Sequence, residues 1–127
     1  MSNQPIFAED EVLRRFKGRT KLFLKFSHRF FGNIPQLKED IERFRALEDP
    51  DEIRTWAHSM AGVVGNLGGK RLFDAAKALE FAAEETDKTA TIAARLEDLD
   101  RELRVFESEL GIRSEQMEQK KRAEESE

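Results

Sequence analysis

The sequence has no cysteine among its 127 residues. This absence excludes disulfides, zinc sites built from thiolates and a cysteine nucleophile. The sequence also lacks any apolar run near the ~20 residues that a membrane-spanning helix needs. Its first residues, MSNQPIFAEDEV, lack the basic start and the long apolar stretch of a signal peptide. Since a chain without cysteine suits a reducing compartment, we expect a cytoplasmic protein that does not bind a membrane.

Neither sign of charge dominates the chain. Charged residues make up 38% of it, yet the net charge is only −4. A protein that binds nucleic acid needs a basic excess to neutralise phosphates, so we expect no nucleic-acid partner. The length suits a single domain, and a chain of this size buries roughly two thirds of the surface that its unfolded form exposes.

Every strong periodic pattern in the sequence is helical, and no alternating strand pattern is present. A short first helix is interrupted at Gly18, and a phenylalanine-rich stripe follows it. Gly32-Asn33 and then Pro35 mark a break or a kink in this stripe. Residues 19–47 are therefore predicted to form either one kinked helix or two helices.

The next helix has clear signals at both ends. Asp49 suits the N-cap position and Pro50 suits the first helical position. Gly68-Gly69 ends the helix as a C-terminal glycine does. A further helix is predicted from Lys70 to about Thr86, and the sequence TDKTAT after it is a polar turn.

The last apolar stripe, in residues 92–110, is the most regular one and is predicted to end at Gly111. The sequence SEQMEQKKRAEESE beyond it is nearly all charged or polar, so residues 111–127 are predicted to be a frayed helix or a disordered tail. Long helices joined by short turns pack side by side. We predict an all-α fold, an antiparallel four-helix bundle over residues 9–110 with a short extra N-terminal helix that acts as a lid.

The stretch HSMAGVVGNLGG, residues 58–69, places glycines inside a helix beside one of only two histidines. An interior glycine costs a helix roughly 1 kcal/mol relative to alanine, so Gly62 and Gly65 need an explanation. The helical neighbours of His58 are Arg54, Ala61, Gly62 and Gly65. Small residues there leave room for a partner to reach the imidazole. The alternative is close helix packing within the chain.

Such a histidine has a clear chemical use. An imidazole in water is largely neutral and nucleophilic at pH 7, because its ordinary pKa is about 6.5. The ring attacks an activated phosphoryl group and holds it as a phosphoramidate. Since phosphoryl transfer depends mainly on positioning and charge stabilisation, a partner that brings the metal supplies most of the rest. Arg54, Lys70 and Arg71 are candidates for local positive charge.

The sequence AHSMAGVVGNLGGKRL resembles the signature of the histidine-containing phosphotransfer (HPt) domain, with His58, Gly62 and Gly68 at the matching positions. The resemblance covers residues 9–110. It implies a four-helix bundle that carries phosphate between the receiver domains of response regulators, with a hybrid sensor kinase as a further candidate partner. It also implies that His58 is the phosphoacceptor, that the receiver supplies the aspartate and Mg²⁺, and that the chain has no cofactor and no kinase activity.

Ala61 departs from the family pattern, because many HPt domains have a lysine three residues after the histidine. That lysine is associated with orienting or neutralising the phosphoryl group, so we expect Arg54 or Lys70 to replace it. We expect a monomeric, free-standing shuttle. The departure also leaves open a second hypothesis, a helical interaction module that binds a receiver or kinase without carrying phosphate.

Three weaker interpretations are set aside. A coiled-coil adaptor is disfavoured, because the heptad pattern over residues 92–110 falls short of about three to four repeats. Two histidines that lie far apart in the sequence argue against a metal site. The sequence GNLGGKR lacks the spacing and the following Ser or Thr of a nucleotide-binding loop, so we expect no ATP binding.

The remaining aromatic and imidazole side chains are predicted to be structural. His28 has no small residues around it, and we expect it to be a surface residue. Trp56 lies on the opposite side of its helix from His58, in the core or lining a groove. We expect the following phenylalanines to be mostly in the core, with one or two beside the histidine: Phe23, Phe26, Phe30, Phe31, Phe44, Phe73, Phe81 and Phe106.

Overall fold

The computed structural model describes residues 3–46, 49–85 and 89–125. Within these residues the chain is helical and contains no strand, which confirms the predicted all-α class. None of the described helices is long and apolar enough to cross a membrane. The helices are α1 (Glu9–Phe16), α2 (Thr20–Ala46), α3 (Pro50–Asn66), α4 (Lys70–Glu84) and α5 (Thr89–Glu125).

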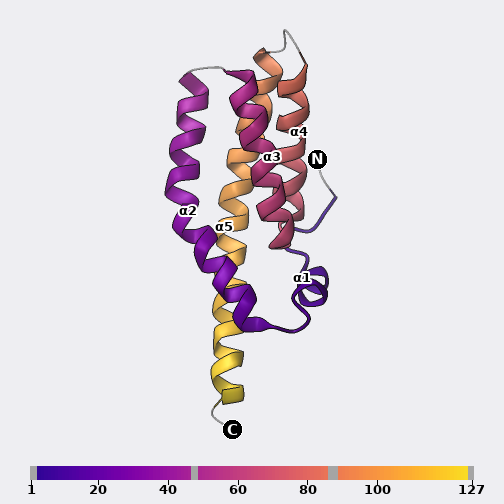
Figure 1. Ribbon diagram of the computed structural model, residues 1–127, viewed down its shortest axis with the longest axis vertical. Coiled ribbons are helices and arrows are strands. Elements are labelled where there is room, and N and C mark those ends of the chain that lie inside the picture. Colours follow the sequence, from indigo (N-terminus) through magenta and orange to yellow (C-terminus); the bar gives the residue numbers. More distant parts are fainter. Residues whose placement is uncertain (1–2, 47–48, 86–88, 126–127) are drawn as a thin grey trace.

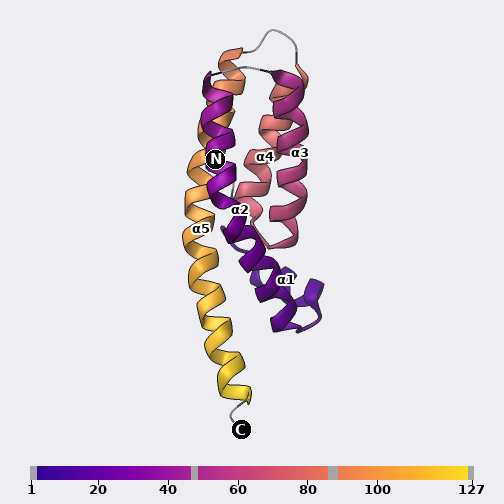
Figure 2. The ribbon, with the colours of Figure 1, turned by 60° about the vertical axis from the view of Figure 1, so that its left-hand side comes forward.

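The four long helices form an antiparallel bundle, as predicted. Helices α2 and α4 run in one direction, while α3 and α5 run in the other (Figure 1). Helix α3 packs closely on α4, and α5 packs on both α4 and α2. The short helix α1 lies at the end of the bundle where α2 begins and α3 ends, and Figure 2 shows it in the same place from a second direction.

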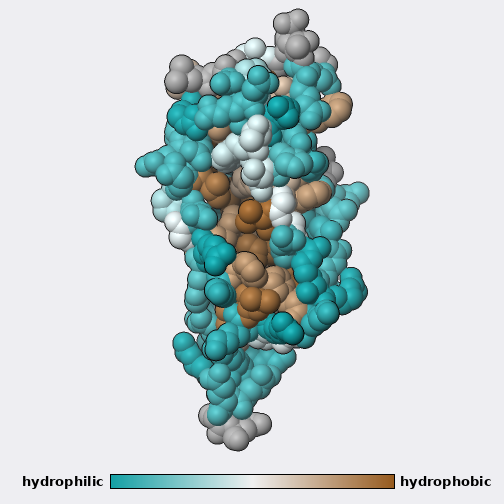
Figure 3. All heavy atoms as spheres, in the orientation of Figure 1, coloured by the Kyte–Doolittle hydropathy of each residue, from teal (hydrophilic) through white to brown (hydrophobic). Residues whose placement is uncertain are grey.

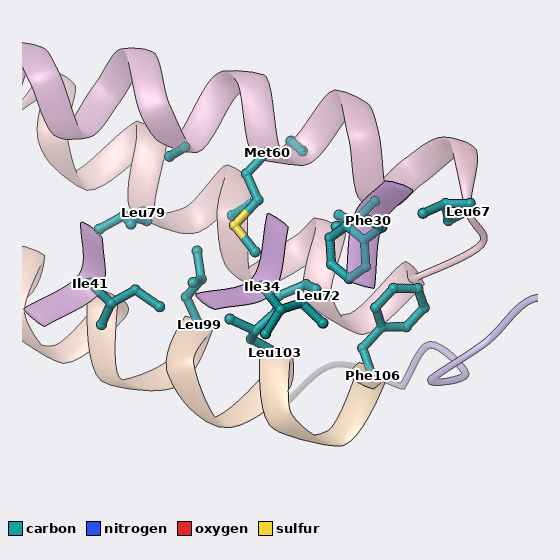
Figure 4. Close-up of a cluster of buried hydrophobic side chains, with 14 of the residues drawn as sticks. Phe30, Ile34, Ile41, Met60, Leu67, Leu72, Leu79, Leu99, Leu103 and Phe106 are labelled. Atoms are coloured by element: carbon teal, nitrogen blue, oxygen red, sulfur yellow. The ribbon is translucent and has the colours of Figure 1, made fainter. Parts of the chain in front are cut away.

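The core runs along the middle of the bundle and uses one stripe from each long helix (Figure 4). Helix α2 contributes Phe30, Ile34 and Ile41, and all three are buried. The stripe predicted in the last helix is buried throughout, which confirms it. Its members are Ile92, Leu96, Leu99, Leu103, Phe106 and Leu110.

Two of the phenylalanines expected in the core are exposed. Phe26 is 39% exposed and Phe81 is 64% exposed, because each lies on the outward side of its helix. Phe31 and Phe73 are partly buried against the core. The other four are buried as predicted: Phe23, Phe30, Phe44 and Phe106.

The segment for which one or two helices were possible is the single helix α2, with Pro35 inside it. A proline in a helix removes one backbone hydrogen bond and crowds the preceding turn, so the helix bends there. Figures 1 and 2 both show the axis of α2 changing direction along its length. Ile34 and Ile41 on either side of the proline stay buried, so the core stripe continues through the bend.

Both predicted ends of α3 are confirmed. The carboxylate of Asp49 accepts a hydrogen bond of 3.3 Å from the backbone N–H of Glu52, and Pro50 is the first helical residue. At the other end, Gly68 adopts a left-handed φ of +79°. The carbonyl of Gly68 then accepts a hydrogen bond of 2.8 Å from the N–H of Ala8, which holds the segment before α1 against the turn between α3 and α4.

Helix α5 does not stop at Gly111, where the last apolar stripe is predicted to end, but continues to Glu125. Beyond the glycine, Ser114 is buried and Met117 packs against the core. These contacts offset the roughly 1 kcal/mol that glycine costs inside a helix. The division of the chain into residues 9–110 and a tail of residues 111–127 stays a prediction.

The end of α4 and the start of α5 lie close to the predicted polar turn. Helix α4 ends at Glu84, and α5 begins at Thr89. The predicted end near Thr86 and the first half of the TDKTAT turn lie outside the described residues, which omit residues 86–88. The second half, residues 89–91, is the start of α5, so the predicted turn is wrong there.

We predict that Gly68→Ala lowers the free energy of unfolding by about 2 to 4 kcal/mol. A methyl group there would meet Cγ2 of Val12 at 2.5 Å, and alanine is strained at a φ of +79°. Urea denaturation followed by circular dichroism measures the change. Gly32→Ala is the control, because nothing lies within 4 Å of its added Cβ, and it should instead gain roughly 0.5 to 1 kcal/mol. Equal effects of the two substitutions would contradict this explanation.

Candidate functional site

His58 lies near the middle of α3, on the flank of the buried stripe, and its side chain is 70% exposed. The buried stripe contains Ile53, Ala57, Met60 and Val64. His58 follows Ala57 by one residue, and this offset turns its imidazole away from the core. The predicted exposure of His58 is therefore confirmed.

The imidazole is held by a carboxylate from the next helix. Nδ1 of His58 lies 2.8 Å from Oε2 of Glu80 on α4. The other carboxylate oxygen, Oε1, accepts a hydrogen bond of 2.6 Å from Nζ of Lys77. The side chain of Glu80 is only 12% exposed, so one largely buried carboxylate joins the lysine to the histidine.

The charge of this carboxylate is maintained by its partners. The hydrogen bond from Lys77 is the main cause that lowers the pKa of Glu80 below its ordinary value. Burial opposes this shift, and the hydrogen bond with His58 lowers the pKa further. Glu80 is therefore ionised at neutral pH and acts only as an acceptor. In a neutral imidazole, this acceptor favours the tautomer that carries its proton on Nδ1, which leaves the lone pair on Nε2.

The sequence offered no signal for Glu80. It lies 22 residues after His58, and the acidic residues of its segment resemble an ordinary solvated helix face. Only the register of α4 against α3 brings it to the histidine. Small buried side chains on both helices, Ala57 and Ala61 on α3 and Ala76 on α4, let the two backbones lie close together.

The two interior glycines of α3 have different roles. An added Cβ at Gly62 would meet nothing within 4 Å, so packing within the chain does not require glycine there. Gly65 is different, because its added Cβ would lie 3.2 Å from Cδ2 of Phe73. Its carbonyl also accepts a hydrogen bond of 2.7 Å from Nη1 of Arg15. Close packing, the alternative weighed for the glycines, therefore accounts for Gly65, and only Gly62 leaves open space beside the histidine.

Ala61 is not the accessible docking residue that the sequence predicted. It is 2% exposed, because its position one turn after His58 faces α4. Its small size serves the close packing of α3 on α4.

Of the three basic residues expected near His58, two form ion pairs with other described helices and one does not. Arg54 is exposed, one turn before His58, and forms no ion pair with the described residues. Lys70 pairs with Glu11 of α1 at 2.7 Å, and Arg71 pairs with Glu102 of α5 at 2.6 Å. The structure thus brings Arg54 to the histidine's side of α3, while Lys70 and Arg71 are engaged with other helices.

The residues predicted to be structural have structural contacts. His28 is exposed on α2, and its Nε2 lies 3.3 Å from Oε1 of Glu118 on α5. Trp56 is partly buried and donates a hydrogen bond of 3.0 Å from Nε1 to Asp40, with its ring edge-on to Phe44. Within the described part of the chain, no cluster of three or more histidine or acidic residues is arranged to hold a metal ion.

An apolar groove lies beside the C-terminal half of α3, where α3 faces α1 and α2. Figure 3 shows apolar side chains exposed in the middle of the face that α1, α2 and α3 share. The groove has a volume of about 440 Å³, and Arg15 and Arg29 add positive charge to its lining. Its apolar members are Phe16, Phe26, Phe30, Val63 and Leu67.

Comparison with known families fits this arrangement. The family model for the Hpt domain matches residues 25–125, which is well over half of the chain. The chain belongs to the HPt domain family. Members of this family take part in phosphotransfer in two-component systems, generally as phosphocarriers without kinase activity, and typically interact with receiver domains. No curated protein and no solved structure matches the chain significantly.

We predict that Glu80 fixes the tautomer of His58, and that imidazole ¹⁵N chemical shifts measure this directly. In the wild type above pH 8, Nδ1 of His58 should carry the proton. Glu80→Ala should convert the ring to a mixture of tautomers, because the acceptor for Nδ1–H is lost. His28 is the internal control, since its Nε2 faces Glu118 and its signals should not respond to the substitution. Unchanged His58 signals in Glu80→Ala would show that Glu80 does not orient the ring.

Proposed function

We propose that this HPt domain accepts a phosphoryl group on Nε2 of His58 from the aspartyl phosphate of a receiver domain and passes it to the aspartate of another receiver. The observation that carries the proposal is the combination of an exposed imidazole, a largely buried glutamate on its Nδ1, and open space beside Gly62. Together they present a nucleophile of fixed orientation to a second protein.

In the proposed step, the lone pair of Nε2 attacks the phosphorus of the aspartyl phosphate. The P–N bond forms while the bond from phosphorus to the aspartate oxygen breaks, and its electron pair leaves on the aspartate carboxylate. The imidazole ring becomes positively charged and keeps its proton on Nδ1. The ionised Glu80, 2.8 Å away, stabilises that charge. Reversal of the same step on a second receiver delivers the phosphoryl group.

The receiver and this chain each contribute different groups to the proposed transfer. The receiver supplies the aspartate and Mg²⁺, and this chain contributes no cofactor. The groove lined by Phe26 and Val63 supplies an apolar surface for the receiver, and Arg15 and Arg29 supply complementary charge for a partner with an acidic site. We propose that the protein works as a monomeric cytoplasmic shuttle, and that Arg54 adds positive charge near the imidazole.

The first test is phosphotransfer from a phosphorylated, Mg²⁺-loaded receiver domain to the wild type and to His58→Gln. We expect acid-labile, alkali-stable label on the wild type and none on the variant, because glutamine has no nucleophilic ring nitrogen. Label that persists on the variant would move the site elsewhere, and His28→Gln would then be tested. Binding without label on either chain would favour the interaction module, the hypothesis that Ala61 leaves open.

We also predict that Gly62→Leu slows transfer from the receiver at least about tenfold, because the new side chain occupies the approach to the imidazole. The same substitution should raise the free energy of unfolding by roughly 0.5 to 1 kcal/mol, since leucine is a better helix former than glycine. Gly32→Leu on α2 is the matched control and should be stabilised without loss of transfer. A Gly62→Leu variant that transfers at the wild-type rate would remove the access role of the glycine.

A further inference from the structure

The proposed site gains net negative charge when His58 is phosphorylated. A phosphoryl group on Nε2 carries up to about two negative charges near neutral pH. The ionised carboxylate of Glu80 lies on the opposite edge of the same ring, and Ala61 beside it is uncharged and buried. The phosphorylated ring carries one positive charge, so the phosphoryl group and Glu80 together still leave the site with a net negative charge, which a nearby cation would stabilise.

The described cations differ in how they are held. Lys70 and Arg71 are paired with Glu11 and Glu102 on helices α1 and α5. Arg54 is near His58 in sequence, but no ion pair with the described residues fixes its guanidinium. Lys77 is the cation that the structure ties to the imidazole, because it shares the carboxylate of Glu80 with it.

The ammonium of Lys77 lies next to the carboxylate that contacts the imidazole. Nζ of Lys77 lies 2.6 Å from Oε1 of Glu80, and Oε2 lies 2.8 Å from Nδ1 of His58. The Lys77 side chain is 46% exposed, whereas that of Glu80 is 12% exposed. The lysine therefore has solvent around it in which to move, and its flexible four-carbon stem has three donors to share.

We propose that Lys77 binds the phosphoryl group on His58, and so supplies from α4 the positive charge that α3 lacks at Ala61. This inference rests on the proposed function. Before transfer the ammonium donates to Oε1 of Glu80. When the P–N bond forms, the ammonium turns one of its hydrogens to a phosphoryl oxygen, while Glu80 keeps the proton on Nδ1 as its partner. Lys77 itself neither gains nor loses a covalent bond.

A titration of the phosphorylated chain tests this assignment. The chain is phosphorylated with the small molecule phosphoramidate, or with a phosphorylated receiver, and the ³¹P chemical shift of the phosphohistidine is followed against pH. An adjacent cation favours the doubly charged phosphoryl group, so in Lys77→Gln the midpoint should rise by about half a pH unit or more. Lys77→Arg keeps the positive charge, so its midpoint should lie close to that of the wild type. Lys77→Gln should also slow labelling by phosphoramidate about threefold to tenfold.

Lys38→Gln is the matched control. Lys38 is 48% exposed and pairs with Glu107 across α2 and α5, so its loss removes the same charge and a similar ion pair without touching α3 or α4. Its midpoint should equal that of the wild type. An unchanged midpoint in Lys77→Gln, or a shift found in Arg54→Gln in its place, would overturn the assignment while leaving the phosphoacceptor role of His58 intact. A wild-type chain that neither donor labels would overturn both.

Discussion

The close packing of α3 on α4 determines the geometry on which the rest of the site depends. The turn at Gly68 and Gly69 reverses the chain, and buried alanines on both helices keep the two axes near each other. This packing sets the register that places Glu80 against His58 across 22 residues of sequence. A shift of α4 by one residue would rotate Glu80 by about 100° away from the imidazole and leave the ring without its acceptor.

The same turn also organises the end of the bundle. The carbonyl of Gly68 accepts a hydrogen bond from the N–H of Ala8, and the carbonyl of Gly65 accepts one from the guanidinium of Arg15. Helix α1 is thus attached to the end of the helix that carries the histidine. Because Phe16 of α1 and Phe26 of α2 both line the apolar groove, the groove depends on this attachment as well. One local backbone arrangement therefore supports both the end of the helix that carries His58 and the apolar groove.

Local signals in the sequence predicted local features well. The caps of α3, the break at Gly18 and the exposure of His58 each follow from a few neighbouring residues, and all three are found in the structure. Features set by packing between helices could not be predicted in this way. Glu80 required the register of α3 against α4, and the burial of Ala61 required knowing on which side α4 lies. Helix α5 passes through Gly111 because tertiary contacts of Ser114 and Met117 outweigh the local preference of glycine.

The site is divided between two helices, so it cannot be transferred to another protein by grafting one of them. His58 belongs to α3, whereas Glu80 and Lys77, which form a chain of hydrogen bonds to its imidazole, belong to α4. A graft of α3 alone onto another bundle would transfer a histidine with an undefined proton position. The smallest unit that contains both partners of the contact between His58 and Glu80 is the hairpin of α3 and α4 with its glycine turn. The orientation of the His58 ring therefore depends on a residue far outside the stretch HSMAGVVGNLGG that contains the histidine.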